Sequence, residues 1–288
     1  MCYNNRKFLF TEETVMNKRV LTVQDISCVG QCSLTVALPI VSACGIETCV
    51  LPSSVLSTHT GGFQGFTFRD LTEDMPKIKD HWVKEAIKFE AVYTGYLGSI
   101  KQMDYVEDIC KATLKDGGTL FIDPAMADNG KLYYGFDEKF AAAMAKFSGN
   151  ADYVLPNVTE ACFMTGTEYR ETYDEAYIDE LIRKLLALGA KKVVFTGIGY
   201  TDKTTGVVVS DGKTTDYYCH EKLAQGCHGT GDIFASAFVG SVMQGKSDFE
   251  AAKIAADYVL NCIKYTHEHA PDHWYGACLE PLLYTLKA

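Results

Sequence analysis

The sequence lacks any long cluster of lysine or arginine, and its 27 basic residues are outnumbered by 37 acidic ones, for a formal net charge of -10. Nucleic acids and anionic membranes are usually bound through a basic patch, so we expect neither partner. No apolar run reaches the length of a membrane span. An anionic ligand would therefore have to be bound locally, by backbone N–H groups and a metal ion.

The sequence also lacks a CxxC pair, although it contains 11 cysteines. Cys28 and Cys32 have no histidine cluster nearby, so we expect no structural zinc, and we interpret the cysteines as free thiols in a reducing compartment. Residues 1–17 have no secretory apolar region, which predicts a cytoplasmic protein. We interpret residues 1–17 as an N-terminal extension, either a loose, disordered segment or the product of a misplaced start ahead of Met16.

No linker rich in proline, glycine or serine divides the rest of the chain, which predicts one domain over residues 18–288. Strand-like apolar runs alternate with helical patterns, which predicts an α/β fold: a doubly wound, mostly parallel sheet flanked by helices. Two strand patterns joined by Asp211-Gly212 predict a β-hairpin at the sheet edge. The predicted strands are 19–24, 47–52, 91–94, 119–123, 153–155, 192–196, 205–210 and 214–219, and the predicted helices are 33–44, 78–88, 101–115, 136–147, 175–188, 232–244 and 249–268.

Polar residues follow the predicted parallel strands. Ligands of open parallel sheets bind at the carboxyl ends of the strands, so these residues should gather at one edge. They include Asp25 after the first strand, 94–96 after the third, Asp123 after the fourth, 156–160 after the fifth, and Thr196-Gly197 at the sixth.

The stretch GCHGTGDIFASAF, residues 226–238, places glycines at the start of an apolar helical pattern. Gly229 and Gly231 allow a sharp turn that exposes consecutive N–H groups, and a helix N-terminus attracts anions. Asp232 then either caps the helix or serves beside the anion site. Carboxylates next to an anion fit a bridging divalent ion such as Mg²⁺, which points to phosphoryl transfer with Asp232 as the base.

Five segments resemble, in order, motifs of the ribokinase superfamily and of its vitamin B6 branch, the pyridoxal kinases. The segments read STHTGG (57–62), TGY (94–96), DPAMADNGKLY (123–133), PNVTEACFMTG (156–166) and GTGD (229–232), and the resemblance extends from about Arg19 to Gln244, roughly four fifths of the chain. The resemblance implies a ribokinase-like kinase domain that transfers phosphate from ATP to the 5′-hydroxymethyl group of a vitamin B6 vitamer. It also implies Mg²⁺, a monovalent cation such as K⁺, and a homodimer.

The resemblance assigns a role to each matching position. It makes Asp232 the base that deprotonates the vitamer. The anion hole would consist of Gly229, Thr230 and Gly231. ATP would be bound by Asn157, Thr196, Asp128 and Glu160, the metal ions would lie by Asp128, Glu160 and Asp123, and the vitamer would contact Asp25, His59, Thr60 and Tyr96. Structural alternatives are a turn at Asp123, an ordinary first-turn carboxylate at Glu160 and a core position for Tyr96.

Asp25 departs from the resembling pattern, which has a serine there, while Ser27 comes two residues later. An ionised carboxylate only accepts hydrogen bonds, so Asp25 would favour pyridoxamine, which has an ammonium group, over pyridoxal. The alternative is that Asp25 caps the turn or helix after the first strand. Ala125 and Ala127 also stand where valine and glycine are commoner.

Two other functions remain open. A hydroxymethylpyrimidine kinase of thiamin synthesis, or an enzyme serving both vitamins, has the same fold, but that branch resembles this chain less, since it carries cysteine at the position of Asp232 and a glycine-rich segment after the first strand. A sugar kinase fits less well because its early glycine-rich segment is missing. From another class, the chain could be a vitamin or nucleotide binder without catalysis, although an intact Asp232 speaks against this.

Overall fold

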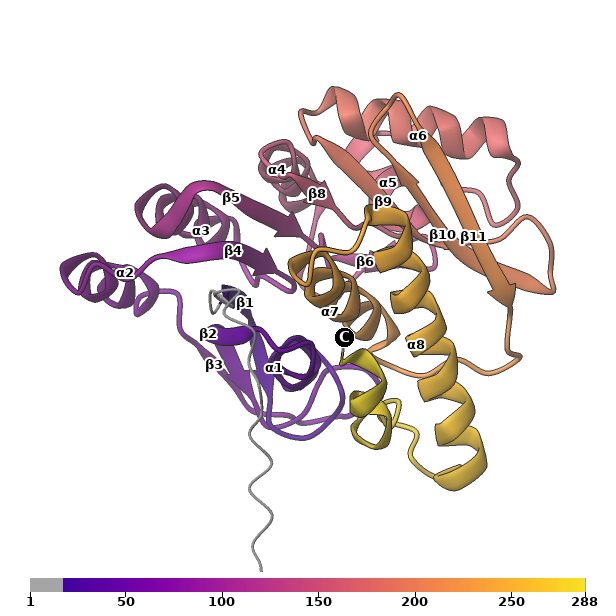
Figure 1. Ribbon diagram of the computed structural model, residues 1–288, viewed down its shortest axis with the longest axis horizontal. Helices are drawn as coiled ribbons and strands as arrows, with labels where there is room; N and C mark the ends of the chain where they lie inside the picture. The colour runs from indigo at the N-terminus through magenta and orange to yellow at the C-terminus, as the bar shows by residue number, and fades with distance from the viewer. Residues whose placement is uncertain (1–17, 288) are drawn as a thin grey trace, which may run out of the picture.

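The computed structural model describes residues 18–287, so the interpretation of residues 1–17 lies outside the described part. A nine-stranded sheet forms the centre of the molecule, in the order β11-β10-β9-β8-β5-β4-β1-β2-β3 (Figure 1). The pairs from β2 to β9 are parallel, and antiparallel strands lie at both ends of the sheet. The strands are β1 (Arg19–Ser27), β2 (Glu47–Leu56), β3 (Phe68–Asp70), β4 (Phe89–Thr94), β5 (Leu114–Ile122), β8 (Tyr153–Val154), β9 (Lys192–Ile198), β10 (Thr204–Ser210) and β11 (Thr215–Glu221).

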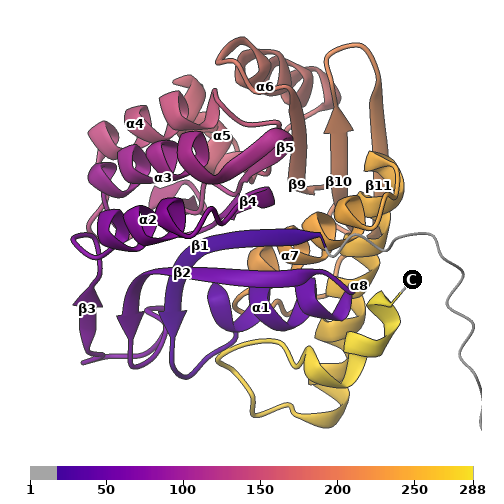
Figure 2. The same cartoon turned by 60° about the vertical axis from the view of Figure 1, so that its left-hand side comes forward.

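Helices cover both faces of the sheet, as Figure 2 shows. One face carries α2 (Met75–Lys84), α3 (Ile100–Thr113), α4 (Glu138–Ser148), α5 (Val158–Thr165) and α6 (Glu175–Ala187). The other carries α1 (Leu34–Ala43), α7 (Thr230–Met243), α8 (Asp248–His269) and the short 3₁₀ helix η1 (Glu280–Leu286). Both faces of β1 are therefore covered, and Val20, Leu21 and Val23 are all buried, as expected of a strand with helices on both sides. The doubly wound fold is confirmed.

The predicted hairpin at the sheet edge is confirmed as β10 and β11, which are antiparallel. The sequence interpretation missed β3, the helix α5 and a small separate hairpin of β6 (Ala127–Asp128) and β7 (Lys131–Leu132). These elements are too short to show a clear hydrophobic period. Within residues 18–287, no helix combines the length and apolarity that a bilayer crossing requires.

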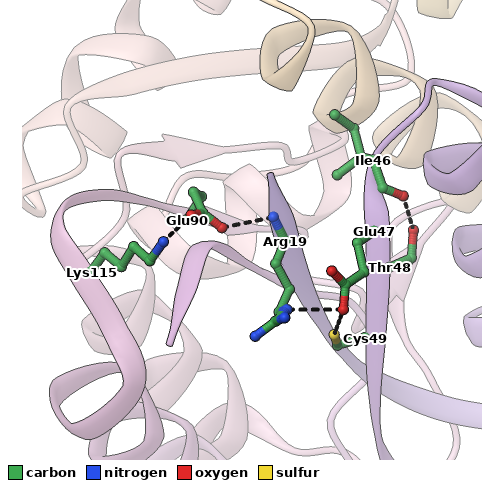
Figure 3. A network of polar contacts seen from close by, with 7 residues as sticks. All are labelled: Arg19, Ile46, Glu47, Thr48, Cys49, Glu90 and Lys115. Carbon is green, nitrogen blue, oxygen red and sulfur yellow. Dashed lines mark hydrogen bonds and ion pairs between the residues drawn. The ribbon is translucent and has the colours of Figure 1, made fainter. Parts of the chain in front are cut away.

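Charged side chains connect the amino ends of neighbouring strands, opposite the edge where polar residues were expected (Figure 3). The carboxylate of Glu90 accepts a hydrogen bond of 2.7 Å from the Arg19 backbone N–H and pairs with Lys115. The Arg19 side chain donates to Glu47 over 3.0 Å. These contacts link β1, β2, β4 and β5, so they are a stabilising feature remote from the candidate site.

Candidate active site

The residues after β4, β5 and β8 lie at the carboxyl edge of the sheet, as predicted. Asp123 directly follows β5, and its N–H donates to the Thr94 carbonyl at the end of β4 over 2.9 Å. One position needs correction, because β1 is longer than the sequence indicated: Asp25 lies inside β1, which continues through pairs with β2 to Ser27. Thr196 lies inside β9, as the predicted strand 192–196 had it, and β9 continues to Ile198.

The N-terminus of α7 is open. Its N-cap is Gly229, which has a φ of 77° and makes no side-chain cap, so no side chain occupies the first N–H groups of the helix. Gly229 is required there because a Cβ atom on it would lie 1.7 Å from the Gln31 carbonyl oxygen. Thr230 and Gly231 follow in the first turn, so the predicted anion-hole residues form one helix start.

Asp232 lies half-buried in that first turn, and the interpretation of it as an N-cap is wrong because Gly229 holds that position. Burial raises the pKa of Asp232 to about 7, a hydrogen bond from the Ser33 backbone opposes the rise, and the charge of Asp25 adds to it. A carboxylate with a pKa near neutrality can accept a proton from an alcohol and release it again. The geometry therefore suits a general base beside an anion site.

Asp123 and Glu160 form a buried acidic pair, and Asp123 is close enough to Asp232 for the two charges to interact. Burial raises the pKa of Asp123 well above its ordinary value, and Asp232 raises it further. Burial and then Asp123 raise the pKa of Glu160, although backbone N–H groups lower it. Carboxyl groups that repel one another in a buried site are poised to bind a cation.

Glu160 also has a structural role. It is 3% exposed, and its two oxygens accept N–H groups of Met126 at 3.2 Å and Asn157 at 2.9 Å. The Asn157 side chain accepts the Glu160 N–H in return, which forms a capping box, and donates to the Ala127 carbonyl at 2.9 Å. Glu160 is thus a first-turn carboxylate that ties the 123–133 loop to α5.

Tyr133 lies within electrostatic range of the candidate carboxylates. Burial raises the pKa of its phenol, and the charges of four carboxylates raise it further. These carboxylates belong to Glu160, Asp128, Asp123 and Asp232. Asp128 is the exposed member, and its oxygens accept the backbone and side-chain N–H groups of Asn129, each at 2.9 Å.

The donor set of the site has the chemistry that a hard divalent cation requires. Hard carboxylate oxygens suit Mg²⁺, and no basic side chain is among the groups that act on Asp123 or Glu160. In the described residues 18–287, however, no three side chains of His, Cys, Asp or Glu form a ready cage. The residues therefore fit an ion that takes its remaining ligands from phosphate oxygens and water, as Mg²⁺ does at nucleotide sites.

Asp25 lies close enough to Asp232 for its charge to raise the pKa of Asp232. It is 5% exposed and accepts a hydrogen bond of 3.1 Å from the Ser27 hydroxyl. Tyr96, which follows β4, lies close enough that burial and the charge of Asp25 raise its pKa to about 12. Asp25, Tyr96 and Asp232 thus surround one region at the edge of the sheet.

His59 belongs to a neighbouring loop and is largely occupied by the protein. Its Nδ1 accepts the Gly61 N–H at 3.1 Å, so its Nε2 donates to the Tyr275 carbonyl at 2.7 Å. Burial lowers its pKa, so the ring is neutral. Its centroid is 5.3 Å from that of His228, which connects the loop to the start of α7, while Thr60 is exposed on the same loop.

Sequence reasoning missed Tyr133 and Ser33. Tyr133 closes the resembling segment 123–133, and its N–H donates to the Met126 carbonyl at 2.8 Å, so its place in that motif was a usable signal. Ser33 is buried at the N-cap of α1 with a φ of 55°. No sequence pattern marks a serine with that backbone conformation.

Comparison with known proteins identifies the family of this chain. The phosphomethylpyrimidine kinase family model matches residues 38–277. A Bacteroides thetaiotaomicron protein assigned to the phosphomethylpyrimidine kinases is 35% identical, with a TM-score of 0.90 over 96% of both chains. A pyridoxal kinase structure from Lactobacillus plantarum is 30% identical, with a TM-score of 0.86 over 93% of this chain and 96% of that one.

A curated pyridoxal kinase from Dictyostelium discoideum is 25% identical over 270 residues, which are 88% of this chain and 87% of that protein. The family match covers well over half of the chain, and the fold agrees with it throughout. The chain therefore belongs to the phosphomethylpyrimidine kinase family and is a kinase with the ribokinase-like fold.

Proposed function

We propose that this kinase phosphorylates the 5′-hydroxymethyl group of a vitamin B6 vitamer at the expense of ATP. The observation that carries the proposal is Asp232, a half-buried carboxyl with a pKa of about 7 in the first turn of an uncapped helix. The family and the pyridoxal kinase relatives support the substrate class. We also propose that residues 18–288 act as one kinase domain.

In the proposed reaction, Asp232 accepts the proton of the vitamer hydroxyl as its oxygen attacks the γ-phosphorus of ATP. The new O–P bond forms while the bond from the γ-phosphorus to the bridging oxygen breaks, and ADP leaves. The N–H groups of 229–231 stabilise the negative charge on the transferring group, because they are fixed and unpaired with side chains. Asn157 and Thr196 lie on the nucleotide side of this step.

Asp128 and Glu160 would hold Mg²⁺, and Asp123 would contribute to the binding of a metal ion, including a monovalent cation. When bound, Mg²⁺ offsets the charge of the phosphate oxygens. Glu160 contributes further by holding the 123–133 loop through its two backbone contacts. On the acceptor side, Asp25, Thr60 and Tyr96 contact the vitamer ring, and His59 orders the loop that carries Thr60.

Hydroxymethylpyrimidine is the alternative acceptor, because the family is described by phosphomethylpyrimidine kinase activity. The carboxylate at position 232 favours a vitamin B6 vitamer as the acceptor, since the thiamin branch carries a cysteine there. An enzyme that serves both vitamins satisfies the same observations. Homodimerisation stays a prediction, which light scattering after size-exclusion chromatography would check.

A coupled ADP-release assay tests the proposal with pyridoxal, pyridoxamine, pyridoxine and hydroxymethylpyrimidine as acceptors. We expect turnover of at least one vitamer with a kcat/KM above that for the pyrimidine. A higher value for hydroxymethylpyrimidine would replace the proposal with the alternative. Binding of ATP and a vitamer without any ADP release would identify a binding protein.

A further inference from the structure

The end of β1 contains a carboxyl group, Asp25, for which the proposed reaction has no chemical step. Asp25 is buried, and burial raises its pKa while hydrogen bonds from Ser33 and Ser27 lower it. No basic side chain of the described chain is among the groups that act on it. A buried carboxylate without a cationic neighbour is costly, which makes it a candidate partner for a positive charge on a ligand.

Asp25 does not act as a cap. It lies within β1, and the N-cap of α1 is Ser33, which makes no side-chain capping bond. The bridge between Ser33 and Ile26 places Ser33 beside the end of β1, and the Ser33 hydroxyl lies close enough to Asp25 to lower its pKa. The Ser33 side chain thus interacts with Asp25 and does not cap α1, as an N-cap serine usually would.

Ser33 contacts both carboxyl groups of the site, because its backbone interacts with Asp232 and its hydroxyl with Asp25. It does so at a φ of 55°, which is strained for any residue but glycine. The adjacent Gln31 carbonyl touches Gly229, so the position of this turn is tied to the start of α7. Such strain persists where the surrounding structure needs the geometry.

We propose that Asp25 selects acceptors that carry a positive charge beside the ring, and that Ser33 is the positioning residue that holds Asp25 for this contact. The inference rests on the proposed vitamin B6 kinase function. Pyridoxamine offers an ammonium group where pyridoxal offers an aldehyde oxygen, which a carboxylate repels. Tyr96, whose hydroxyl lies within the field of Asp25, borders the same region.

The test compares kcat/KM for pyridoxamine and pyridoxal in matched variants. Asp25→Ser and Asp25→Asn should lower the pyridoxamine-to-pyridoxal ratio by roughly ten- to a hundredfold, through loss of a charge-assisted contact. Ser33→Ala removes the hydroxyl but keeps the N–H, so it should lower the ratio in the same direction by roughly two- to tenfold. Ser33→Gly should give the same ratio as Ser33→Ala but a higher Tm, because glycine adopts this φ without strain.

Ser148→Ala is the matched control, since Ser148 is a buried serine of α4 whose hydroxyl has no hydrogen-bond partner within residues 18–287. Its ratio should equal that of the wild type. A ratio within twofold of wild type in Asp25→Ser, with both vitamers turned over, overturns the role of Asp25. A wild-type ratio in Ser33→Ala overturns the positioning role.

Calorimetric binding of the two vitamers separates this inference from the proposed function. If the wild type turns over neither vitamer, the proposed function fails, while a preference for pyridoxamine in binding that Asp25→Ser abolishes still supports the role of Asp25. Equal binding of both vitamers by wild type and Asp25→Ser overturns it.

Discussion

The backbone carbonyl oxygen of Gln31 lies 1.7 Å from the point where a Cβ atom on Gly229 would be. The turn before α1 and the start of α7 therefore meet with no room for a side chain. This contact joins two segments nearly two hundred residues apart and positions the helix start that carries Asp232. The close approach makes Gly229 a structural requirement of the candidate site.

Gly229→Ala should destabilise the protein by about 2 kcal/mol or more, because the methyl group meets a backbone atom and the φ of 77° is strained for alanine. Urea denaturation measures the change. Gly231→Ala is the control for stability, since a Cβ atom there has no neighbour within 4 Å. Equal stability of the two variants would contradict the role given to the contact.

Asp232→Asn should lower kcat by roughly 10²–10⁴-fold if Asp232 is the base. The same variant should be more stable than wild type at pH 8, by at least about 1 kcal/mol. The folded-state pKa of about 7 lies above the ordinary 3.8, so ionisation costs the wild type stability as pH rises through this range. The two proteins should be equally stable below pH 3.8. A folded variant with normal turnover would reject the assignment.

The rate should depend on pH through the same group. Below a pH of about 7, kcat/KM should fall close to tenfold per unit as Asp232 of the free enzyme becomes protonated. Asp25→Asn should move this midpoint down, because the charge of Asp25 contributes to the raised pKa. Values of kcat/KM from pH 5 to 9 give the midpoint. A midpoint that is the same in both proteins would exclude coupling of the two carboxyl groups.

Asp128→Ala should raise the Mg²⁺ concentration for half-maximal rate by roughly three- to tenfold, because an exposed carboxylate near the phosphates is lost. Asp211→Ala is the control, since Asp211 is an exposed aspartate that accepts only local N–H groups in the β10–β11 turn. Glu160→Gln should also raise the requirement but lose stability, as its carboxylate ties two backbone segments. Unchanged Mg²⁺ titrations in both site variants would remove the metal assignment.

Glu90→Gln should lower stability by about 0.5–1 kcal/mol at pH 7, without a change in kcat. Burial raises the pKa of Glu90, but hydrogen bonds from Lys115 and the Arg19 backbone outweigh it, so the pKa lies below 4.5. This contribution is present above pH 4.5 and is lost as pH falls through the lowered pKa, so the variants should converge in acid. Glu171→Gln, an exposed loop glutamate, is the control. Persistence of the difference at pH 3 would contradict the ionic explanation.

Local patterns in the sequence determined the alternation of strands and helices, the edge hairpin and the family. An apolar run predicts a buried parallel strand, and glycines before a helical pattern predict an anion site at the helix start. Each of these patterns is contained within about ten residues of sequence. The end of β1 was missed because Asp25 is a polar residue inside the strand, and β9 continues past the predicted 192–196 to Ile198. Only partner strands, through their hydrogen bonds, extend β1 to Ser27.

Only the tertiary structure decided the electrostatics of the candidate site. The pKa of Asp232 depends on burial, on the Ser33 backbone and on Asp25, and the last two belong to a segment about two hundred residues away in the chain. Four carboxylates raise the pKa of Tyr133, and they come from distant segments of the chain. The contacts of Ser33 with Asp25 and Asp232 likewise require distant segments to be brought together. The sequence specifies the residue types, but the burial of each carboxyl group and the distances between the charges are determined only when the chain folds.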